Sequence, residues 1–261
     1  MWNLDQISPV AFRIGPKLIY WYGVFVAVGF VVGIAVAGRL LRREGLPAAA
    51  AGDIGVWALV GGMLGGRLLY VLTEWDYYVR NPLEIPRIDH GGLVYLGGLA
   101  GGILGIYLYV RRQSLSAWPV LDAFSPALAL GHAFGRVGCL LRGCCYGTPT
   151  RLPWGVWLGG ELRHPTPLYA AAMNALLALA LVGFYRHRRF PGQVFVFYLL
   201  AYGTGRFLTD FLRGDFPSRP IMGWMATSQL MSLTVVMAGA LLWRARTRAV
   251  RREPGPLPTT D

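Results

Sequence analysis

The sequence has few charged residues and very few acidic ones. Of its 261 residues, 15% are charged, and 13 Asp and Glu stand against 25 Lys and Arg. A typical soluble domain has about 25% charged residues, whereas 54% of this chain is hydrophobic. Apolar stretches of about 20 residues, long enough to cross a bilayer, recur along its whole length. The composition therefore predicts an all-α polytopic membrane protein.

Cysteine is also scarce. The three cysteines all lie between residues 139 and 145, too few and too close together for a disulfide framework. They lack a second nearby pair and the His/Cys/Asp spacing of zinc sites, so we expect no metal and no cofactor. The chain has no internal repeat, which gives an inverted-repeat transporter no support. Its first residues lack the basic start and apolar core of a cleaved signal peptide, so we expect the first apolar segment to be retained.

The net charge of +12 is concentrated in alternate loops. Hydropathy predicts seven spans, near residues 18–38, 53–73, 92–110, 119–138, 167–185, 193–212 and 223–243. Basic clusters follow every second span, at Arg39–Arg43, Arg111–Arg112, Arg186–Arg189 and Arg244–Arg252. This positive-inside pattern indicates topology rather than a surface for nucleic acid. We expect the N-terminus outside, the C-terminus in the cytoplasm, a transmembrane domain over 1–244 and a basic, disordered tail over 245–261.

The segment GRVGCLLRGCCYG, residues 135–147, combines two arginines, three cysteines and four glycines at the end of an apolar span. Ionisable side chains at the edge of hydrocarbon are costly, so an arginine there predicts a functional site. Closely spaced glycines let a backbone approach a neighbour or a ligand. The alternative is a glycine-rich helix end followed by an arginine that reaches the interface.

Further polar residues stand where a membrane disfavours them. Four residues share one face of the sixth predicted helix: Tyr202, Arg206, Asp210 and Arg213. Arg206 and Asp210 can form a structural ion pair, which is one explanation for both. A single carboxylate does not neutralise these arginines together with Arg67 and Arg136 if all of them converge. Surplus guanidinium groups facing the outer half of the bilayer suit an anionic headgroup such as a phosphate.

Two of the four histidines, His90 and His164, lie on the expected external side beside Gly- and Arg-rich motifs. Either one is explained as a neutral, hydrogen-bonded interface residue. The alternative is a functional role, because histidine titrates near neutrality and accepts a proton from a weak acid such as a thiol.

Six blocks between residues 9 and 244 resemble, in order, those of bacterial phosphatidylglycerol–prolipoprotein diacylglyceryl transferases. They are PVAFRIGP with YWYG, GGRLLYVL at 65–72, GGLVYLGGLAGG at 91–102, GRVGCLLRGCCYG at 135–147, RHPTPLY at 163–169 and AYGTGRFLTDFLRGD at 201–215. The resemblance implies an enzyme without metal or nucleotide. It would transfer the diacylglyceryl group of phosphatidylglycerol to the lipobox cysteine thiol of a prolipoprotein, forming a thioether and releasing glycerol phosphate.

The resemblance also implies partners, location and site residues. The partners are phosphatidylglycerol, prolipoprotein signal peptides and membrane lipid, and the site faces the outer leaflet of the bacterial inner membrane. Arg136 and Arg206 would be catalytic, binding the phosphate and stabilising its developing charge, and we place His90 beside them as proton acceptor. The substrate-binding residues would be Tyr22, Arg67, Gly98, Arg142, Gly147, His164, Tyr169, Asp210 and Arg213.

The chain departs from the family pattern at several positions. Leu96 stands where the family has a histidine, and His90 is the nearest histidine to it. Other family residues, two asparagines and two acidic residues, are replaced by Cys139, Arg142, Cys144 and Ala170. Two alternatives follow. One is a related transferase that uses phosphatidylglycerol with another acceptor, and the other is a membrane thiol–disulfide oxidoreductase built on the cysteines.

Overall fold

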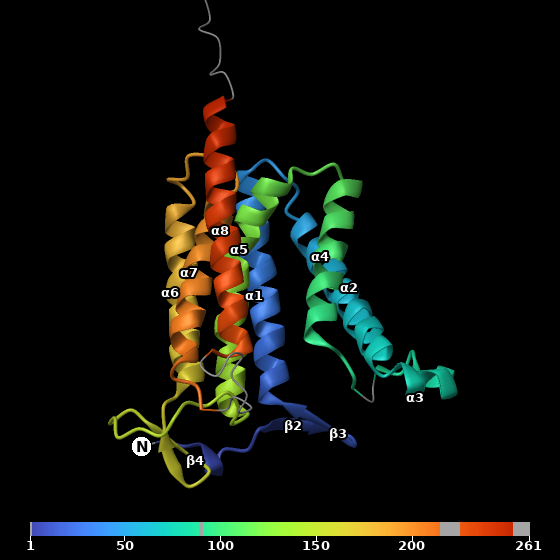
Figure 1. Ribbon diagram of the computed structural model, residues 1–261, viewed down its shortest axis with the longest axis vertical. Helices are drawn as coiled ribbons and strands as arrows, with labels where there is room; N and C mark the ends of the chain where they lie inside the picture. The colour runs from blue at the N-terminus through green and yellow to red at the C-terminus, as the bar shows by residue number, and fades with distance from the viewer. Residues whose placement is uncertain (1, 89–90, 215–224, 253–261) are drawn as a thin grey trace, which may run out of the picture. The chain divides into compact units, whose positions relative to one another are not determined.

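The computed structural model describes residues 2–88, 91–214 and 225–252 (Figure 1). Within these ranges, seven helices have 18 or more residues: α1 Trp21–Arg43, α2 Ala50–Thr73, α4 Tyr95–Arg112, α5 Ala117–Leu141, α6 Thr166–Phe184, α7 Gln193–Asp210 and α8 Thr227–Arg252. Each overlaps one of the predicted spans. Four of them, α1, α2, α5 and α6, are long and apolar enough to cross a membrane. The structure is therefore that of a helical membrane protein.

Short elements lie between the long helices. Helix α3 covers Trp75–Arg80, and five short strands are β1 Trp2–Asn3, β2 Val10–Ile14, β3 Lys17–Tyr20, β4 Val156–Leu158 and β5 Glu161–Arg163. Strands β2 and β3 form an antiparallel hairpin, while β4 pairs with both β1 and β5. The sequence analysis missed these strands, because an apolar window of 20 residues averages over two to five residues. The first helix consequently begins at Trp21 and not near residue 18.

The chain divides into two compact units. One comprises Met1–Val36 and Leu121–Asp261, with α6, α7, α8, all five strands, the start of α1 and most of α5. The other is Ala37–Val120, with α2, α3 and α4. The predicted single domain over 1–244 thus contains two units, and α8 continues to Arg252, into the predicted tail. Residues 253–261 lie outside the described part of the chain.

Glycine packing holds the unit Ala37–Val120 together. Helices α2 and α4 cross at Gly61 and Gly65 of one and Gly97 and Gly101 of the other. A Cβ at Gly65 would overlap the carbonyl oxygen of Gly97, and a Cβ at Gly61 would overlap that of Gly101. Small residues permit this close approach in membranes, where packing contacts drive helix association. The glycine pairs of these two spans therefore serve helix packing.

A buried carboxylate fixes α7 against α5 in the other unit. The Asp122 side chain of α5 has no exposed surface and pairs with Arg188 at 3.0 Å. It accepts hydrogen bonds from the backbone N–H of Gly192 at 2.7 Å and of Phe195 at 2.8 Å, at the start of α7. A carboxylate at a helix N-terminus satisfies free N–H groups and complements the helix dipole. The contact sets the position of α7 relative to α5.

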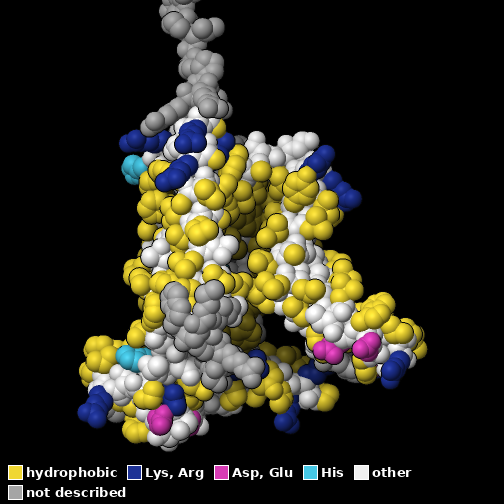
Figure 2. Space-filling view, in the orientation of Figure 1, with side chains coloured by type: hydrophobic (Ala, Val, Ile, Leu, Met, Phe, Trp, Pro, Cys, Tyr) yellow, Lys and Arg dark blue, Asp and Glu magenta, His cyan; other side chains and the backbone are white. Residues whose placement is uncertain are grey.

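The surface of this unit matches a membrane helix bundle. On the face shown in Figure 2, apolar side chains are frequent over α6 and the upper part of α8, and basic side chains gather where α8 ends. Exposed apolar residues of these helices include Leu176, Leu179, Met237 and Leu241. An exposed apolar surface bounded by arginines at one end is typical of helices in lipid.

Candidate active site

Three arginines and one aspartate gather at the ends of α5 and α7. Arg206 contacts Asp210 one turn along α7, with Nη2 and Oδ1 3.1 Å apart. Arg213, just after α7, approaches the same oxygen at 3.8 Å. The charges of Arg136 and Arg213 both act on Arg206. Asp210 is wholly buried, and the side chains of Arg206 and Arg213 keep 16% and 15% of their surface exposed.

This arginine cluster is defined as Arg136, Arg206 and Arg213 around Asp210. Among the residues that the structure describes, Arg206 and Arg213 approach the Asp210 carboxylate, and the charge of Arg136 acts on Arg206. Guanidinium groups are planar, permanently charged and suited to bidentate bonds with phosphate or carboxylate. The cluster brings together three of the five arginines that the sequence analysis named as site residues, and its chemistry is that of an anion site.

A histidine that the sequence analysis did not select lies beside this cluster. His132 stands four residues before Arg136 on the same face of α5. Its ring stacks on Tyr202 of α7, with centroids 4.9 Å apart and planes 11° apart. Nδ1 lies 3.4 Å from the Tyr198 hydroxyl, and the charges of Arg136 and Arg206 act on the ring. The His132 side chain is exposed at the protein surface.

The relation between His132 and the arginines follows from helix geometry. Figure 1 shows α5 and α7 running in the same direction. His132 is one turn before Arg136, and Tyr202 is one turn before Arg206, so the two pairs share a register. The i, i+4 spacing of His132 and Arg136 was visible in the sequence. The stacking contact between His132 and Tyr202, which lies seventy positions further along the chain, could not be predicted from it.

Gly147 joins three segments near the cluster. Its N–H donates to the carbonyl of His164 at 2.9 Å, and it forms a β-bridge with Arg213. A Cβ here would lie 2.8 Å from the carbonyl oxygens of both His164 and Leu212, closer than such atoms pack. Only glycine fits without displacing them, so Gly147 places Arg213 and His164 by backbone contacts.

His164 and Tyr169 form a small polar group beyond Gly147. The Tyr169 hydroxyl accepts a hydrogen bond from the indole N–H of Trp154 at 2.8 Å and lies 3.3 Å from Nδ1 of His164. Trp154 is 58% exposed. The predicted substrate-binding residues His164 and Tyr169 are thus next to each other at the N-terminal end of α6. Their hydrogen-bonding partner Trp154 was not predicted as a site residue.

Tyr22 and Arg142 meet at the start of α1. The guanidinium carbon of Arg142 lies 6.0 Å from the centroid of the Tyr22 ring, a cation–π distance. A Cβ at Gly138 would lie 3.0 Å from the Cα of Tyr22, so the second glycine of the GRVG run lets α1 approach α5. These two predicted substrate-binding residues therefore lie next to each other.

Arg67 belongs to the other unit and holds a loop. It is 6% exposed, and its guanidinium donates to four backbone carbonyls: Glu84 at 2.6 Å, Ile85 at 2.8 Å, Gly91 at 2.8 Å and Gly92 at 3.3 Å. It also packs on the rings of Tyr70 and Tyr78. These bonds use most of its five donors, so Arg67 holds the backbone of residues 84–85 and 91–92.

Gly98 and His90 are the remaining predicted residues in the sequence range 37–120. Gly98 is in α4, where a Cβ would lie 3.4 Å from the Gly62 carbonyl, so it contributes to the α2–α4 crossing. His90 lies outside the described residues. The neighbouring Gly91 and Gly92 have φ of 82° and 76°, and both carbonyls accept from Arg67. The backbone that follows His90 is therefore fixed.

Comparison with known proteins agrees with these motifs. Residues 9–245 match the family described as prolipoprotein diacylglyceryl transferase. A phosphatidylglycerol–prolipoprotein diacylglyceryl transferase of Finegoldia magna is 38% identical over 234 residues, which cover 89% of this chain and 93% of that protein. Those of Clostridium tetani and Synechococcus elongatus are 32% and 34% identical, over 91% and 90% of this chain and 97% and 86% of each protein. This chain belongs to the prolipoprotein diacylglyceryl transferase family.

Proposed function

We propose that this protein transfers the diacylglyceryl group of phosphatidylglycerol to the lipobox cysteine of prolipoproteins. The sulfur forms a bond to the diacylglycerol carbon that carries the phosphate. The carbon–oxygen bond to that phosphate breaks, and its electrons leave with glycerol phosphate. The thiol gives its proton to a base. The supporting observation is the arginine cluster, because this reaction requires cations at a leaving phosphate.

The arginine cluster accounts for the leaving group. Arg136 and Arg206 would bind the phosphate and stabilise the charge that grows as the bond breaks. Arg213 would add to the positive field, and buried Asp210 would hold Arg206 and Arg213 in place. Gly147 would keep Arg213 in register. We infer that Tyr22 and Arg142 line the same pocket.

The remaining predicted residues would act around this centre. His164 and Tyr169 would contact substrate at the base of α6, where the exposed Trp154 offers an apolar surface. Arg67 would act through the 84–92 loop rather than by binding phosphate, because its donors are bonded to carbonyls. Gly98 would keep α4 close to α2.

The proton acceptor has two candidates. His90 follows from the sequence, as the histidine nearest to Leu96. His132 follows from geometry, because its ring lies 3.4 Å from the Tyr198 hydroxyl and the charges of Arg136 and Arg206 act on it. It therefore stands beside the arginines that we propose bind the phosphate. We propose that a histidine accepts the thiol proton and that the geometry favours His132.

We propose seven spans in the bacterial inner membrane, with the N-terminus outside, the C-terminus in the cytoplasm and the active site toward the outer leaflet. The alternate basic loops support this orientation. In a cysteine-free background, we expect His187→Cys to resist a membrane-impermeant thiol reagent applied to intact cells, because the loop between α6 and α7 is basic. Trp154→Cys is the matched control and should react. Labelling of residue 187 from outside would reverse the orientation.

Complementation tests the proposed acceptor in a cell. We expect the gene to restore growth and lipoprotein modification in a strain depleted of its own diacylglyceryl transferase. An Arg206→Ala copy, expressed at the same level in the membrane, is the control and should not. Failure of the unaltered gene despite good membrane expression would favour the alternative, a transferase that uses phosphatidylglycerol with another acceptor, which the replacement of the family histidine by Leu96 suggests.

A further inference from the structure

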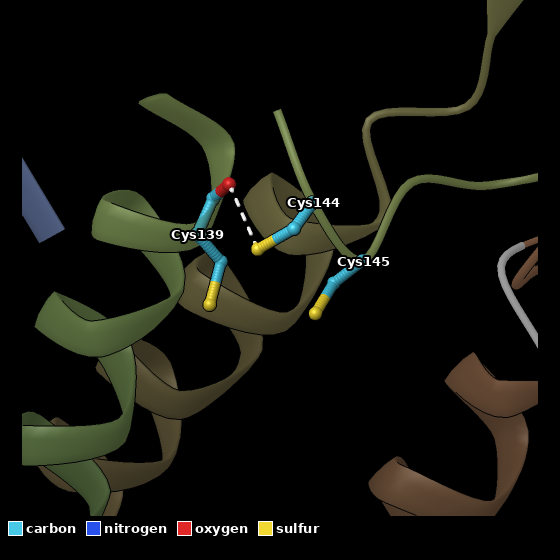
Figure 3. Close-up of side chains that lie close together, drawn as sticks. All are labelled: Cys139, Cys144 and Cys145. Atoms are coloured by element: carbon cyan, nitrogen blue, oxygen red, sulfur yellow. Dashed lines mark hydrogen bonds between the residues drawn. The ribbon is translucent and has the colours of Figure 1, made fainter. Parts of the chain in front are cut away.

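The three cysteines converge on one space. Cys139 is in the last turn of α5, and Cys144 and Cys145 follow in the loop after it. Their three sulfur atoms lie within 4.8 Å of one another, and Figure 3 shows all three facing the same gap. The cysteines are free thiols and are partly buried. The sequence analysis expected no metal at these cysteines, because they lack a second nearby pair; their convergence on one point became visible only in the structure.

Backbone contacts hold these sulfurs in place. The N–H of Cys144 donates to the carbonyl of Cys139 at 3.1 Å, and its thiol lies 3.5 Å from the same oxygen. Thr166, 3% exposed, donates its hydroxyl to the carbonyl of Cys145 at 2.7 Å. Cys145 has φ of 61°, the left-handed region, which lets two adjacent side chains face one point. The thiols are thus fixed from both α5 and α6.

The spacing is close to that of a zinc site. Zinc–sulfur bonds are about 2.3 Å, so sulfurs around a tetrahedral zinc ion are about 3.8 Å apart. The sulfurs here need to approach by about 1 Å or less. A zinc ion with three thiolates carries one net negative charge, and the positive charges of Arg213 and Arg136 act on Cys145. The surroundings therefore favour the charge of the complex.

We propose that Cys139, Cys144 and Cys145 bind one Zn²⁺ ion, with water as the fourth ligand. Each thiol releases its proton to solvent as it bonds to the ion. The site would join the end of α5 to the loop that leads to Gly147. It does not depend on the transferase function, because no step of that reaction uses these thiols.

Metal titration of the purified, reduced, full-length protein tests the site. After treatment with a chelator, we expect one equivalent of Zn²⁺ to bind, measured as metal per protein, and to protect all three thiols from alkylation. Co²⁺ in its place should give thiolate-to-cobalt charge-transfer absorption. This measurement uses the unaltered protein and therefore does not depend on whether a variant folds. Replacing each cysteine singly by serine should weaken Zn²⁺ binding by more than the roughly 10-fold cost of losing an outer-shell partner.

Arg151→Ser, an exposed change in the same loop, is the matched control and should bind Zn²⁺ normally. The Cys139→Ser/Cys144→Ser/Cys145→Ser variant should bind none and keep substantial transfer activity. Absence of Zn²⁺ binding and of the cobalt band would overturn the proposal. So would unchanged zinc content in the triple variant, or binding of Cu⁺ without Zn²⁺ or Co²⁺.

Discussion

Arg206→Ala and Arg136→Ala should each lower turnover by about 10²-fold or more, the cost of removing one donor from a preorganised anion site. The loss should appear chiefly in turnover, because the arginines stabilise charge that grows as the phosphate leaves. Arg206→Lys and Arg136→Lys should be nearly as slow, since lysine keeps the charge but loses the bidentate geometry. Steady-state kinetics with phosphatidylglycerol and a lipobox peptide measure both.

The control for these variants is Arg244→Ala, an exposed arginine of α8 outside the cluster. It should leave turnover unchanged. Thermal unfolding in detergent separates catalysis from folding, because removing Arg206 still leaves Asp210 paired with Arg213 at 3.8 Å. An Arg206→Ala protein that folds normally and turns over at the original rate would exclude the arginine cluster from the reaction.

His132→Ala should depress turnover most near neutral pH and recover partly as pH rises. The reason is the substrate thiol, whose ordinary pKa is about 8.5. When the base is missing, the reaction depends on the fraction of thiol that ionises by itself, and this fraction increases with pH. The arginine variants should show no such recovery. Turnover measured between about pH 6 and pH 9 gives the profile.

His90→Ala and His164→Ala are the comparisons for that profile. We expect a smaller and less pH-dependent loss in each, because we place the proton acceptor at His132, on whose ring the charges of Arg136 and Arg206 act. Recovery at high pH in His90→Ala alone would assign the proton acceptor to His90. Near-normal, pH-independent rates in all three variants would leave direct attack by the thiolate, assisted by the arginines.

Hydropathy predicted the long helices well, because each contains a mostly apolar stretch. It did not predict β2 and β3, whose five and four residues precede α1. It also did not predict the extension of α8 to Arg252, because arginines outnumber apolar residues after Trp243. Pairing of strands and continuation of a charged helix depend on neighbours in space.

The sequence analysis named most of the residues that the structure brings together at the candidate site, but it did not predict what several of them contact. Arg206 and Asp210 were recognisable because they share a helical face. Arg67 was recognised as an arginine in an apolar span, but its partners are carbonyls of a loop about 20 residues away, which no spacing rule gives. His132 was missed because its significance depends on Tyr202, a contact between two helices.

The most direct measurement of the central claim uses purified protein, phosphatidylglycerol and a synthetic lipobox peptide with one cysteine. The peptide mass and the released glycerol phosphate are followed together. We predict a peptide heavier by one diacylglyceryl group in a thioether that resists reducing agents, with one glycerol phosphate released per peptide. Glycerol phosphate released without modification of the peptide, or a peptide changed only by a reducible disulfide, would contradict the account.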